Sequence, residues 1–334
     1  MRLSRRSFGI AVTALALTLG AGACSSSDDG GEGDGATAKV NFGYIADYNG
    51  ASLLAVADAQ GLWKKHGLQA EKKVFTNGPL QVQALGTGDL DFGYIGPGAM
   101  WLPASGKAKI IAINTLGNAD RVIARPGITS IAQLKGKKVA VPEGTSGDMI
   151  LTLALQKAGL DKKDVELVPM EPAAIVSAVS SKQVDAAGFW YPAIATIKKQ
   201  VPGLVELAKN ADFADRVSFP TAFVAGNDVV AKKKDTAEKV TAVLREAIQY
   251  RYDHPDETVE ATSKLLNVPV DQVKTDSANS QALPLADLDE YTGDGTIAKW
   301  LDGMNDYFLS AGKITEKADP STYYTGDLFT AAGE

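Results

Sequence analysis

The chain of 334 residues contains a single cysteine, Cys24, and only two histidines, His66 and His254. One cysteine cannot form a disulfide within the chain, and it cannot build a structural zinc site of the cysteine type. Both histidines stand at expected helix ends or turns, so we interpret them as structural. The sequence also lacks a Gly-x-Ser-x-Gly nucleophile motif and a phosphate-binding loop. These absences predict a protein with no metal, no cofactor and no catalytic residue.

Basic clusters are absent as well. Lysine and arginine number 34 against 40 acidic residues, which gives a formal net charge of −6. No basic run is interleaved with aromatic residues, as nucleic-acid binding would require. The length suffices for one two-lobed protein or for two ordinary domains. We therefore predict a globular monomer without a nucleic-acid partner.

Residues 1–23 predict a secretory signal peptide. Residues 1–6 are basic, and residues 8–19 form an apolar run that is too short to span a membrane. The pair Arg5-Arg6 fits the twin-arginine export signature, but paired arginines also occur in general export signals, so both routes stay open. Either route predicts an extracytoplasmic protein.

Cys24 directly follows this leader, behind Ala21, Gly22 and Ala23. The pattern is similar to a bacterial lipoprotein cleavage box, with alanine where leucine is more usual. A buried thiol is the alternative, but the polar flanks argue against it. Residues 24–38 are rich in Ser, Gly and Asp, which predicts a flexible tether. We expect Cys24 to be lipidated and to anchor the protein to the cell membrane.

The most informative stretch lies near the middle of the chain. Residues 139–141 are typical of a short buried strand, and the apolar spacing over 149–155 predicts a helix. Gly144, Thr145 and Ser146 lie in the turn between them. We expect Thr145 or Ser146 to cap the helix, while amides of its first turn attract an anion. The alternative is an ordinary helix cap without a ligand.

Three further strand ends carry residues of the same kind. Strands are expected at 40–44, 74–76 and 91–95, each followed by a turn and a helix. Binding residues in open α/β folds collect at such carboxyl ends of strands. The candidates in these turns are Asp47, Tyr48, Asn49, Asn77, Gly78, Gly96 and Pro97. For Tyr48, the alternative is a half-exposed ring on the surface.

Two extended segments, 118–124 and 220–225, predict crossings between two lobes. We expect residues 39–122 and 223–334 to form lobe 1, and residues 123–222 to form lobe 2. Lobes joined only by extended segments can rotate as rigid bodies, so we expect this hinge to close on a ligand.

A weak internal repeat in the sequence supports two related halves of the chain. Residues 85–91 and 179–185 each lead from a helix end into a strand and finish with an aspartate. Each segment follows a helix that opens with a proline, Pro79 or Pro172. The two halves therefore look like related β/α units.

Three residues near the crossings are further candidates. Asp120 lies in the first crossing, and Trp190 with Tyr191 follows an expected strand near residue 186. Aromatic side chains at the end of a strand can form the wall of a ligand cleft. For one of the two rings, packing between that strand and the next helix is the alternative.

Four motifs resemble the periplasmic-type binding proteins of taurine, alkanesulfonate and nitrate importers. They are Gly43-Tyr44, residues 86–93, residues 134–140, and Val184-Asp185 followed by Trp190. The resemblance covers nearly the whole mature chain. It implies an α/β fold of the two-lobed, type II periplasmic-binding-protein kind, with two crossover strands as the hinge. It also implies a solute-binding lipoprotein that delivers its ligand to the permease and ATPase subunits of an ABC transporter, with Gly144, Thr145 and Ser146 in the cleft.

Within this family we expect a taurine-like ligand, which is a small sulfonate with an amine. The anionic head would meet the helix starts after Gly78 and Gly144. The amine would need a carboxylate, for which Asp47 is the first choice, Asp148 the second and Asp120 a further candidate. An acidic residue in the first turn of a helix is stabilising by itself, which is the alternative for Asp148.

Other ligands and other classes of function stay open at this point. Binding proteins for nitrate, for a pyrimidine precursor of thiamine and for aromatic acids share this scaffold. An exported enzyme on the same fold is the alternative of a different class, although a related fungal enzyme depends on cysteine and histidine chemistry that this chain lacks. A sensor or adhesion lipoprotein with a vestigial cleft is the third possibility.

Overall fold

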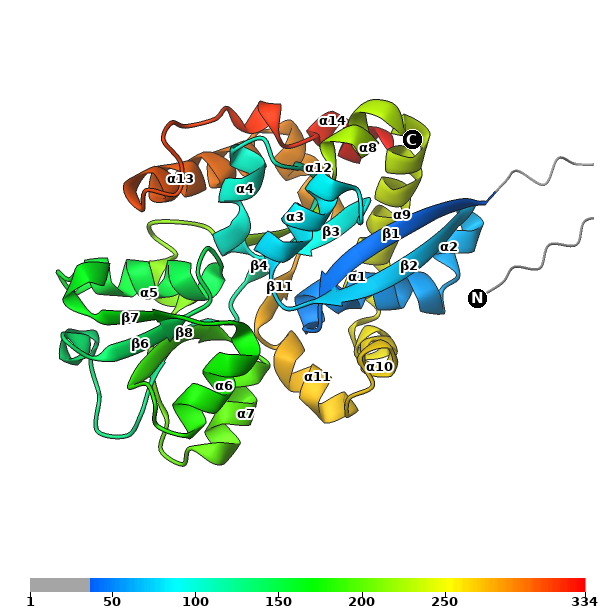
Figure 1. Cartoon of the computed structure of the whole chain (residues 1–334). Coiled ribbons are helices and arrows are strands. Elements are labelled where there is room, and N and C mark those ends of the chain that lie inside the picture. Colours follow the sequence, from blue (N-terminus) through cyan, green and yellow to red (C-terminus); the bar gives the residue numbers. More distant parts are fainter. Residues whose placement is uncertain (1–36, 334) are drawn as a thin grey trace, which may run out of the picture. The chain divides into compact units, whose positions relative to one another are not determined.

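The computed structural model describes residues 37–333, which contain two β-sheets (Figure 1). The six-stranded sheet has the order β11-β4-β10-β3-β1-β2, and the five-stranded sheet has the order β7-β6-β8-β5-β9. Figure 1 shows the chain start in lobe 1 (blue to cyan), form lobe 2 (green) and return to lobe 1 (yellow to red). The predicted two-lobed α/β fold is therefore confirmed. The expected signal peptide, Cys24 and nearly all of the expected tether lie outside the described residues.

Lobe 1 is built on the six-stranded sheet. Its strands are β1 (Ala38–Ile45), β2 (Leu68–Phe75), β3 (Phe92–Ile95), β4 (Lys109–Gly117), β10 (Pro220–Ala225) and β11 (Ser280–Ala282). Its helices are α1 (Tyr48–Ala59), α2 (Leu62–Lys65), α3 (Gly78–Thr87), α4 (Trp101–Ala104), α8 (Asn227–Lys232), α9 (Lys234–Asp253), α10 (Pro255–Leu266), α11 (Val270–Ser277), α12 (Leu285–Gly293), α13 (Thr296–Ser310) and α14 (Gly326–Ala331). Helices α9 and α10 pack on α1.

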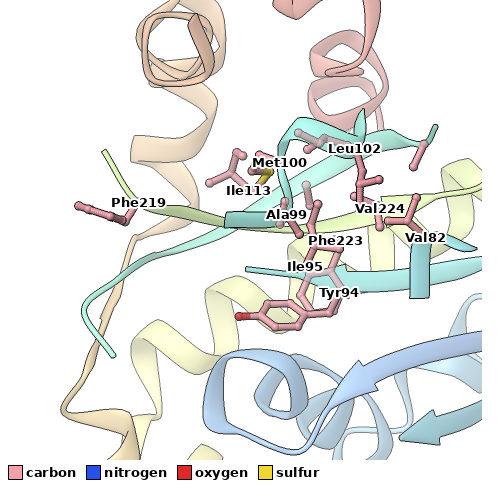
Figure 2. Packing of buried hydrophobic residues seen from close by; sticks show 14 of the residues in the cluster. Val82, Tyr94, Ile95, Ala99, Met100, Leu102, Ile113, Phe219, Phe223 and Val224 are labelled. Carbon is pink, nitrogen blue, oxygen red and sulfur yellow. The ribbon is translucent and has the colours of Figure 1, made fainter. Parts of the chain in front are cut away.

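Aromatic rings fill the centre of this lobe. The ring of Phe42 lies 5.6 Å from that of Phe92 and 5.7 Å from that of Phe223, measured between centroids. Tyr94 packs against Phe223 at 5.6 Å. Figure 2 shows the Tyr94 hydroxyl pointing out of this cluster. Tyr94 thus joins the apolar core of lobe 1 to its polar edge.

Lobe 2 is built on the five-stranded sheet. Its strands are β5 (Asp120–Ala124), β6 (Lys138–Val141), β7 (Glu166–Pro169), β8 (Ala186–Trp190) and β9 (Val205–Lys209), and its helices are α5 (Ser146–Lys157), α6 (Pro172–Ser180) and α7 (Ala193–Gln200). Strand β6 runs parallel to both β7 and β8. The carboxyl ends of these three strands therefore lie at the same edge of the sheet.

The chain passes between the two sheets in two short segments. Strand β4 ends at Gly117 in the first sheet, and β5 pairs with β8 in the second sheet from Asp120 onward. On the way back, β10 pairs with β4 from Pro220 onward. The crossings thus fall at residues 118–119 and just before 220, a few residues ahead of the boundaries expected at 122 and 222. The reason is that β5 and β10 are each paired along their full length within one sheet.

The internal repeat of residues 85–91 and 179–185 has a structural counterpart. The carboxylate of Asp91 accepts a hydrogen bond from the amide of Asn41 at 2.9 Å, and the Asp91 amide donates back to the Asn41 carbonyl at 2.9 Å. Asp185 makes the same two contacts with Lys138, at 3.0 and 2.8 Å. In each lobe, an aspartate before one strand therefore binds the backbone of a neighbouring strand, within β1 for Asp91 and at the start of β6 for Asp185.

No helix between residues 37 and 333 is both long enough and apolar enough to cross a membrane.

Candidate ligand-binding site between the lobes

A cavity lies between the two lobes, with an empty volume of about 490 Å³ that is partly open to solvent. Its walls come from the turns after β1, β2, β3 and β6, from the end of β8, and from both crossings. The predicted site residues that line it are Asp47, Asn49, Asn77, Gly78, Gly96, Pro97, Asp120, Thr145, Ser146 and Trp190. The turns at the carboxyl ends of the strands therefore meet, as the sequence predicted.

Asp47 is the N-cap residue of α1. Its backbone is extended, and its carboxylate accepts a hydrogen bond from the Gly50 amide at 2.7 Å. The side chain is largely buried, with 8% of the residue exposed. Burial raises the pKa of Asp47 well above its ordinary value, and the nearby carboxylates of Asp276 and Asp120 raise it further. A cation beside Asp47 would stabilise the ionised carboxylate and so oppose this rise of the pKa.

Asn49 belongs to the first turn of α1 and not to the preceding loop as predicted. Its side-chain oxygen accepts hydrogen bonds from the hydroxyls of Thr115 at 3.0 Å and Ser280 at 2.6 Å. The Thr115 hydroxyl also contacts that of Thr221 at 2.8 Å. Because the oxygen of Asn49 is engaged by these hydroxyls, its amide nitrogen is the group left to donate to a ligand.

Asp120 is the first residue of β5 and is buried. The side chain of Asn210 holds it, because Asn210 accepts from the Asp120 amide at 2.8 Å and donates to its carboxylate at 2.9 Å. Burial raises the pKa of Asp120, although hydrogen bonds from Ser146 and Asn210 oppose the shift. Asp120 thus brings a second buried carboxylate to the cavity.

The start of α5 differs from the predicted cap. Thr145 is the N-cap residue by backbone conformation, but its hydroxyl donates to the Pro142 carbonyl at 2.6 Å and makes no capping bond. Ser146 is the first helical residue. Gly144 has a φ of +74°, a conformation that favours glycine. The predicted side-chain cap is therefore wrong, because the turn itself uses the Thr145 hydroxyl.

Four of the predicted site residues do not line this cavity: Tyr48, Gly144, Asp148 and Tyr191. Tyr48 packs with Val259 and Val273, away from the cavity. Gly144 accepts a hydrogen bond through its carbonyl from Trp101 at 3.2 Å. The Tyr191 hydroxyl donates to Glu206 at 2.6 Å. Tyr48, Gly144 and Tyr191 therefore contact other parts of the protein and do not line the cavity.

Asp148 instead connects the lobes. Its carboxylate pairs with Lys162 of lobe 2 and with Lys313 of lobe 1, the latter at 3.3 Å. Only 2% of Asp148 is exposed. Burial alone would raise the pKa of Asp148, but Lys162 and Lys313 hold it below its ordinary value. Asp148 is therefore ionised and neutralised by protein, so it is a poor partner for a ligand amine.

Sequence reasoning missed six lining residues: Ile45, Tyr94, Ala99, Gly117, Ala119 and Thr221. Gly117, Ala119 and Thr221 lie in or beside the crossings, so the predicted hinge was the signal that could have found them. Tyr94 lies within a buried strand, where no sequence pattern separates a wall residue from a core residue.

The charge of the cavity is one-sided. None of its lining residues, all within the described range, is lysine, arginine or histidine, whereas Asp47 and Asp120 are both acidic. Arg121 follows Asp120 in sequence, but its guanidinium donates to Glu206 at 3.0 Å and to the Asn118 carbonyl at 2.7 Å. An anionic group in this cavity would therefore depend on neutral donors, and a cationic group would meet carboxylates directly.

The two lobes touch at one side of the cavity. A Cβ atom built at Gly98 of lobe 1 would lie closer than 3.0 Å to the backbone of Thr145 and Ser146 in lobe 2. The carboxylate of Glu171 in lobe 2 also accepts hydrogen bonds from Thr76 and Asn77, each at 3.3 Å. These contacts describe a closed arrangement of the lobes.

Among residues 37–333, no three His, Cys, Asp or Glu side chains are grouped so that they could hold a metal ion.

Comparison with known proteins gives a consistent result. Residues 51–258 match the family model described as NMT1/THI5 like. A protein of Brucella abortus (strain 2308), described only as a binding protein, is 54% identical over 292 residues, which cover 87% of this chain and 92% of the relative. A taurine-binding periplasmic protein of Escherichia coli (strain K12) is 26% identical over 303 residues, covering 85% and 91%. The predicted family resemblance is confirmed.

Solved structures agree on the fold. The periplasmic aliphatic sulphonate binding protein SsuA from Escherichia coli superimposes with a TM-score of 0.67 at 20% identity, over 88% of this chain and 99% of the other. The desulfurization enzyme DszB superimposes with a TM-score of 0.64 at 15% identity, over 88% and 98%. The fold is thus that of periplasmic binding proteins, and it is also used by an enzyme.

Proposed function

Because this chain belongs to the NMT1/THI5-like family, we propose that it is the extracytoplasmic solute-binding component of an ABC importer. The two-lobed fold and the cavity between the lobes support this role. A ligand held between two lobes favours their closed arrangement, and the closed protein would present the ligand to the permease and ATPase subunits. Further support comes from two relatives that are described as binding proteins and that match this chain over nearly their whole length.

The proposed ligand is a small zwitterion of the taurine type, with a sulfonate or similar anionic head and an amine. One observation carries this choice: the cavity has two buried carboxylates, Asp47 and Asp120, and no cationic lining residue. A ligand ammonium could donate charge-assisted hydrogen bonds to both carboxylates. The head would meet Asn77, Ser146 and the amides at the starts of α3 and α5, where helix ends favour negative charge.

Calorimetry with taurine and with ethanesulfonate, which lacks the amine, tests this proposal. We expect taurine to bind, and we expect ethanesulfonate to bind at least about tenfold more weakly, because the loss of one charge-assisted bond costs about 1.5–3 kcal/mol. In Asp47→Asn, the preference for taurine should shrink. Equal affinity for the two ligands would exclude the amine site and favour the alkanesulfonate or nitrate alternative.

A thermal-shift panel widens the search. It should contain nitrate, an aminopyrimidine and an aromatic acid besides the sulfonates, because a ligand that binds only the folded protein raises the melting temperature. Stabilisation by the aminopyrimidine alone would favour a thiamine precursor as the ligand. The same mixtures, analysed by mass spectrometry after overnight incubation, test for an enzyme: unchanged solute supports a binding protein, and product formation would refute it.

The lipid anchor is part of the same proposal. Cys24 and the tether that follows it would hold the binding protein at the outer face of the cell membrane. We expect Cys24→Ser to release the protein from washed membranes and to leave ligand affinity unchanged. Retention of the variant on the membranes would contradict the anchor.

A further inference from the structure

We propose that Asp47 and Asp276 share one proton in the empty site, and that the ammonium of the ligand displaces this proton when it binds. The inference rests on the proposed function, because it requires a ligand with a cationic nitrogen. It assigns a role to Asp276, a residue of α11 that does not line the cavity.

The two carboxylates meet at the start of one helix. Asp47 accepts from the Gly50 amide at 2.7 Å, and Asp276 accepts from the Tyr48 amide at 2.7 Å. These amides lie two residues apart in the first turn of α1. Asp47 is 8% exposed and Asp276 is 7% exposed. Both carboxylates therefore lie at the start of α1, and water reaches neither of them freely.

Neither carboxylate has a counter-ion among residues 37–333. Among the described residues, no lysine, arginine or histidine nitrogen forms a salt bridge within 4.0 Å of Asp47 or Asp276, whereas the buried Asp91 and Asp148 have lysine partners at 2.8 and 3.3 Å. Helix amides offset part of one charge. Two interacting buried carboxylates lose their protons in two steps, which belong to the pair and not to either residue.

The surrounding groups do not supply the missing charge. Asp120 from β5 adds a third acid, and Tyr94 from β3 is a neutral phenol because burial raises its pKa. Tyr48 on α1 is likewise neutral, with a pKa raised by burial. The guanidinium of Arg251, from α9, donates through its Nη atoms to Asn114 at 2.6 Å and to Ser52 at 3.2 Å, while its buried Nε has no partner within the described part of the chain, so Arg251 forms no ion pair with either carboxylate.

Titration behaviour agrees with the geometry. Burial raises the pKa of Asp276 to about 6, and burial together with Asp276 raises the pKa of Asp47 well above its ordinary value. A ligand ammonium at Asp47 favours the ionised forms, so the proton leaves for the solvent. One positive charge enters and one leaves, and the net charge of the site stays the same. Affinity should then fall as the pH drops, by at most tenfold per pH unit, because protons compete with the ligand.

Calorimetry in two buffers with different ionisation enthalpies counts the released protons. With taurine as the probe at pH 5, below the pKa of about 6, we expect the wild type to release close to one proton per bound ligand. In Asp276→Asn, which keeps an oxygen to accept from the Tyr48 amide, we expect the count to fall below that of the wild type and the pH profile of affinity to become flatter, because Asp47 then loses the effect of Asp276 and keeps those of burial and of Asp120. Asp91→Asn, a buried aspartate paired with Lys233, is the matched control and should keep the wild-type count.

Each possible result decides the matter. Binding of taurine by the wild type without proton release, or with unchanged release in Asp276→Asn, would overturn the inference while leaving the proposed function intact. If no cationic solute binds, the proposed function fails, and carboxyl-carbon NMR on the empty protein still tests the shared proton. We expect one carboxyl titration near or above pH 6 that moves to lower pH in Asp276→Asn. Titration of both carboxyls below pH 5 would refute the pair.

Discussion

Replacing Gly98 by alanine should weaken ligand binding while leaving both lobes folded. Gly98 lies in the 3-10 turn Pro97–Ala99 of lobe 1, directly against the start of α5 in lobe 2. A Cβ atom at this position would come closer than 3.0 Å to the carbonyl of Thr145 and the amide of Ser146. Gly98 itself does not line the cavity, so the added methyl group would not touch the ligand.

The size of the effect follows from the overlap. Carbon atoms in contact lie about 3.5–4.0 Å apart, so the closed lobes would have to separate by about 1.5 Å or more at this point. The backbone cannot yield alone, because the Thr145 carbonyl accepts from the Met149 amide within α5 at 3.0 Å. Overpacking of this kind costs about 1–3 kcal/mol. Since only the closed form retains the ligand, a cost of about 2 kcal/mol weakens the apparent affinity about thirtyfold.

Calorimetry measures the affinity of Gly98→Ala, and small-angle scattering measures how far the protein contracts with ligand. Gly86→Ala is the matched control, because Gly86 is exposed on α3 and a Cβ there would meet nothing within 4 Å. We expect the control to bind like the wild type and to melt no earlier, since alanine favours a helix more than glycine does, and we expect the melting temperature of unliganded Gly98→Ala to stay unchanged. If Gly98→Ala binds and contracts like the wild type, the lobes do not approach each other this closely in the bound state. A lower melting temperature without ligand would place the clash inside the fold and not between the lobes.

The sequence predicted where the site lies because position along the chain fixes it. In a parallel sheet, residues just after the strands must gather at one edge, so Asp47, Asn77 and Thr145 reach the cavity whatever their side chains do. The crossings were visible in the same way, as extended segments between two β/α units. Their ends could not be placed to the residue, because the pairing of β5 within lobe 2 is decided by its neighbour β8.

The sequence could not predict the partners of each side chain. Asp148 follows a strand end as Asp47 does, but it lies in the first turn of α5. Its carboxylate pairs there with Lys162 and with Lys313, which is distant in the sequence. Asp276 lies in a polar helix without any motif, and only the folding of α11 against α1 brings it to Asp47. Such contacts depend on tertiary packing, and a single sequence taken by itself carries no signal for them.

Three further substitutions distinguish effects on the stability of the fold from effects on the closure of the two lobes. Gly147→Ala should destabilise lobe 2 by about 1–3 kcal/mol in thermal unfolding, because a Cβ atom there would come closer than 3.0 Å to the Gly188 carbonyl of the same lobe; an unchanged melting temperature would contradict this packing. Asp276→Asn should alter the pH dependence of urea unfolding. Asp276 has a folded pKa of about 6 and an ordinary value near 3.9, so its favourable contribution is complete below about pH 4 and is lost as the pH rises to 6, by about 3 kcal/mol. The variant should lack that loss, and parallel profiles for both proteins would refute the assignment. Lys313→Met should weaken ligand binding by about threefold to tenfold without changing the melting temperature of the empty protein. Lys313 is the lobe 1 partner of Asp148, at 3.3 Å, and the pair exists only when the lobes meet. Asp148 keeps Lys162 within lobe 2, so the variant leaves no buried charge unpaired, and a partly buried pair of this kind is worth about 1 kcal/mol. If instead the empty protein melts earlier and affinity is unchanged, then Lys313 stabilises the fold and does not favour closure.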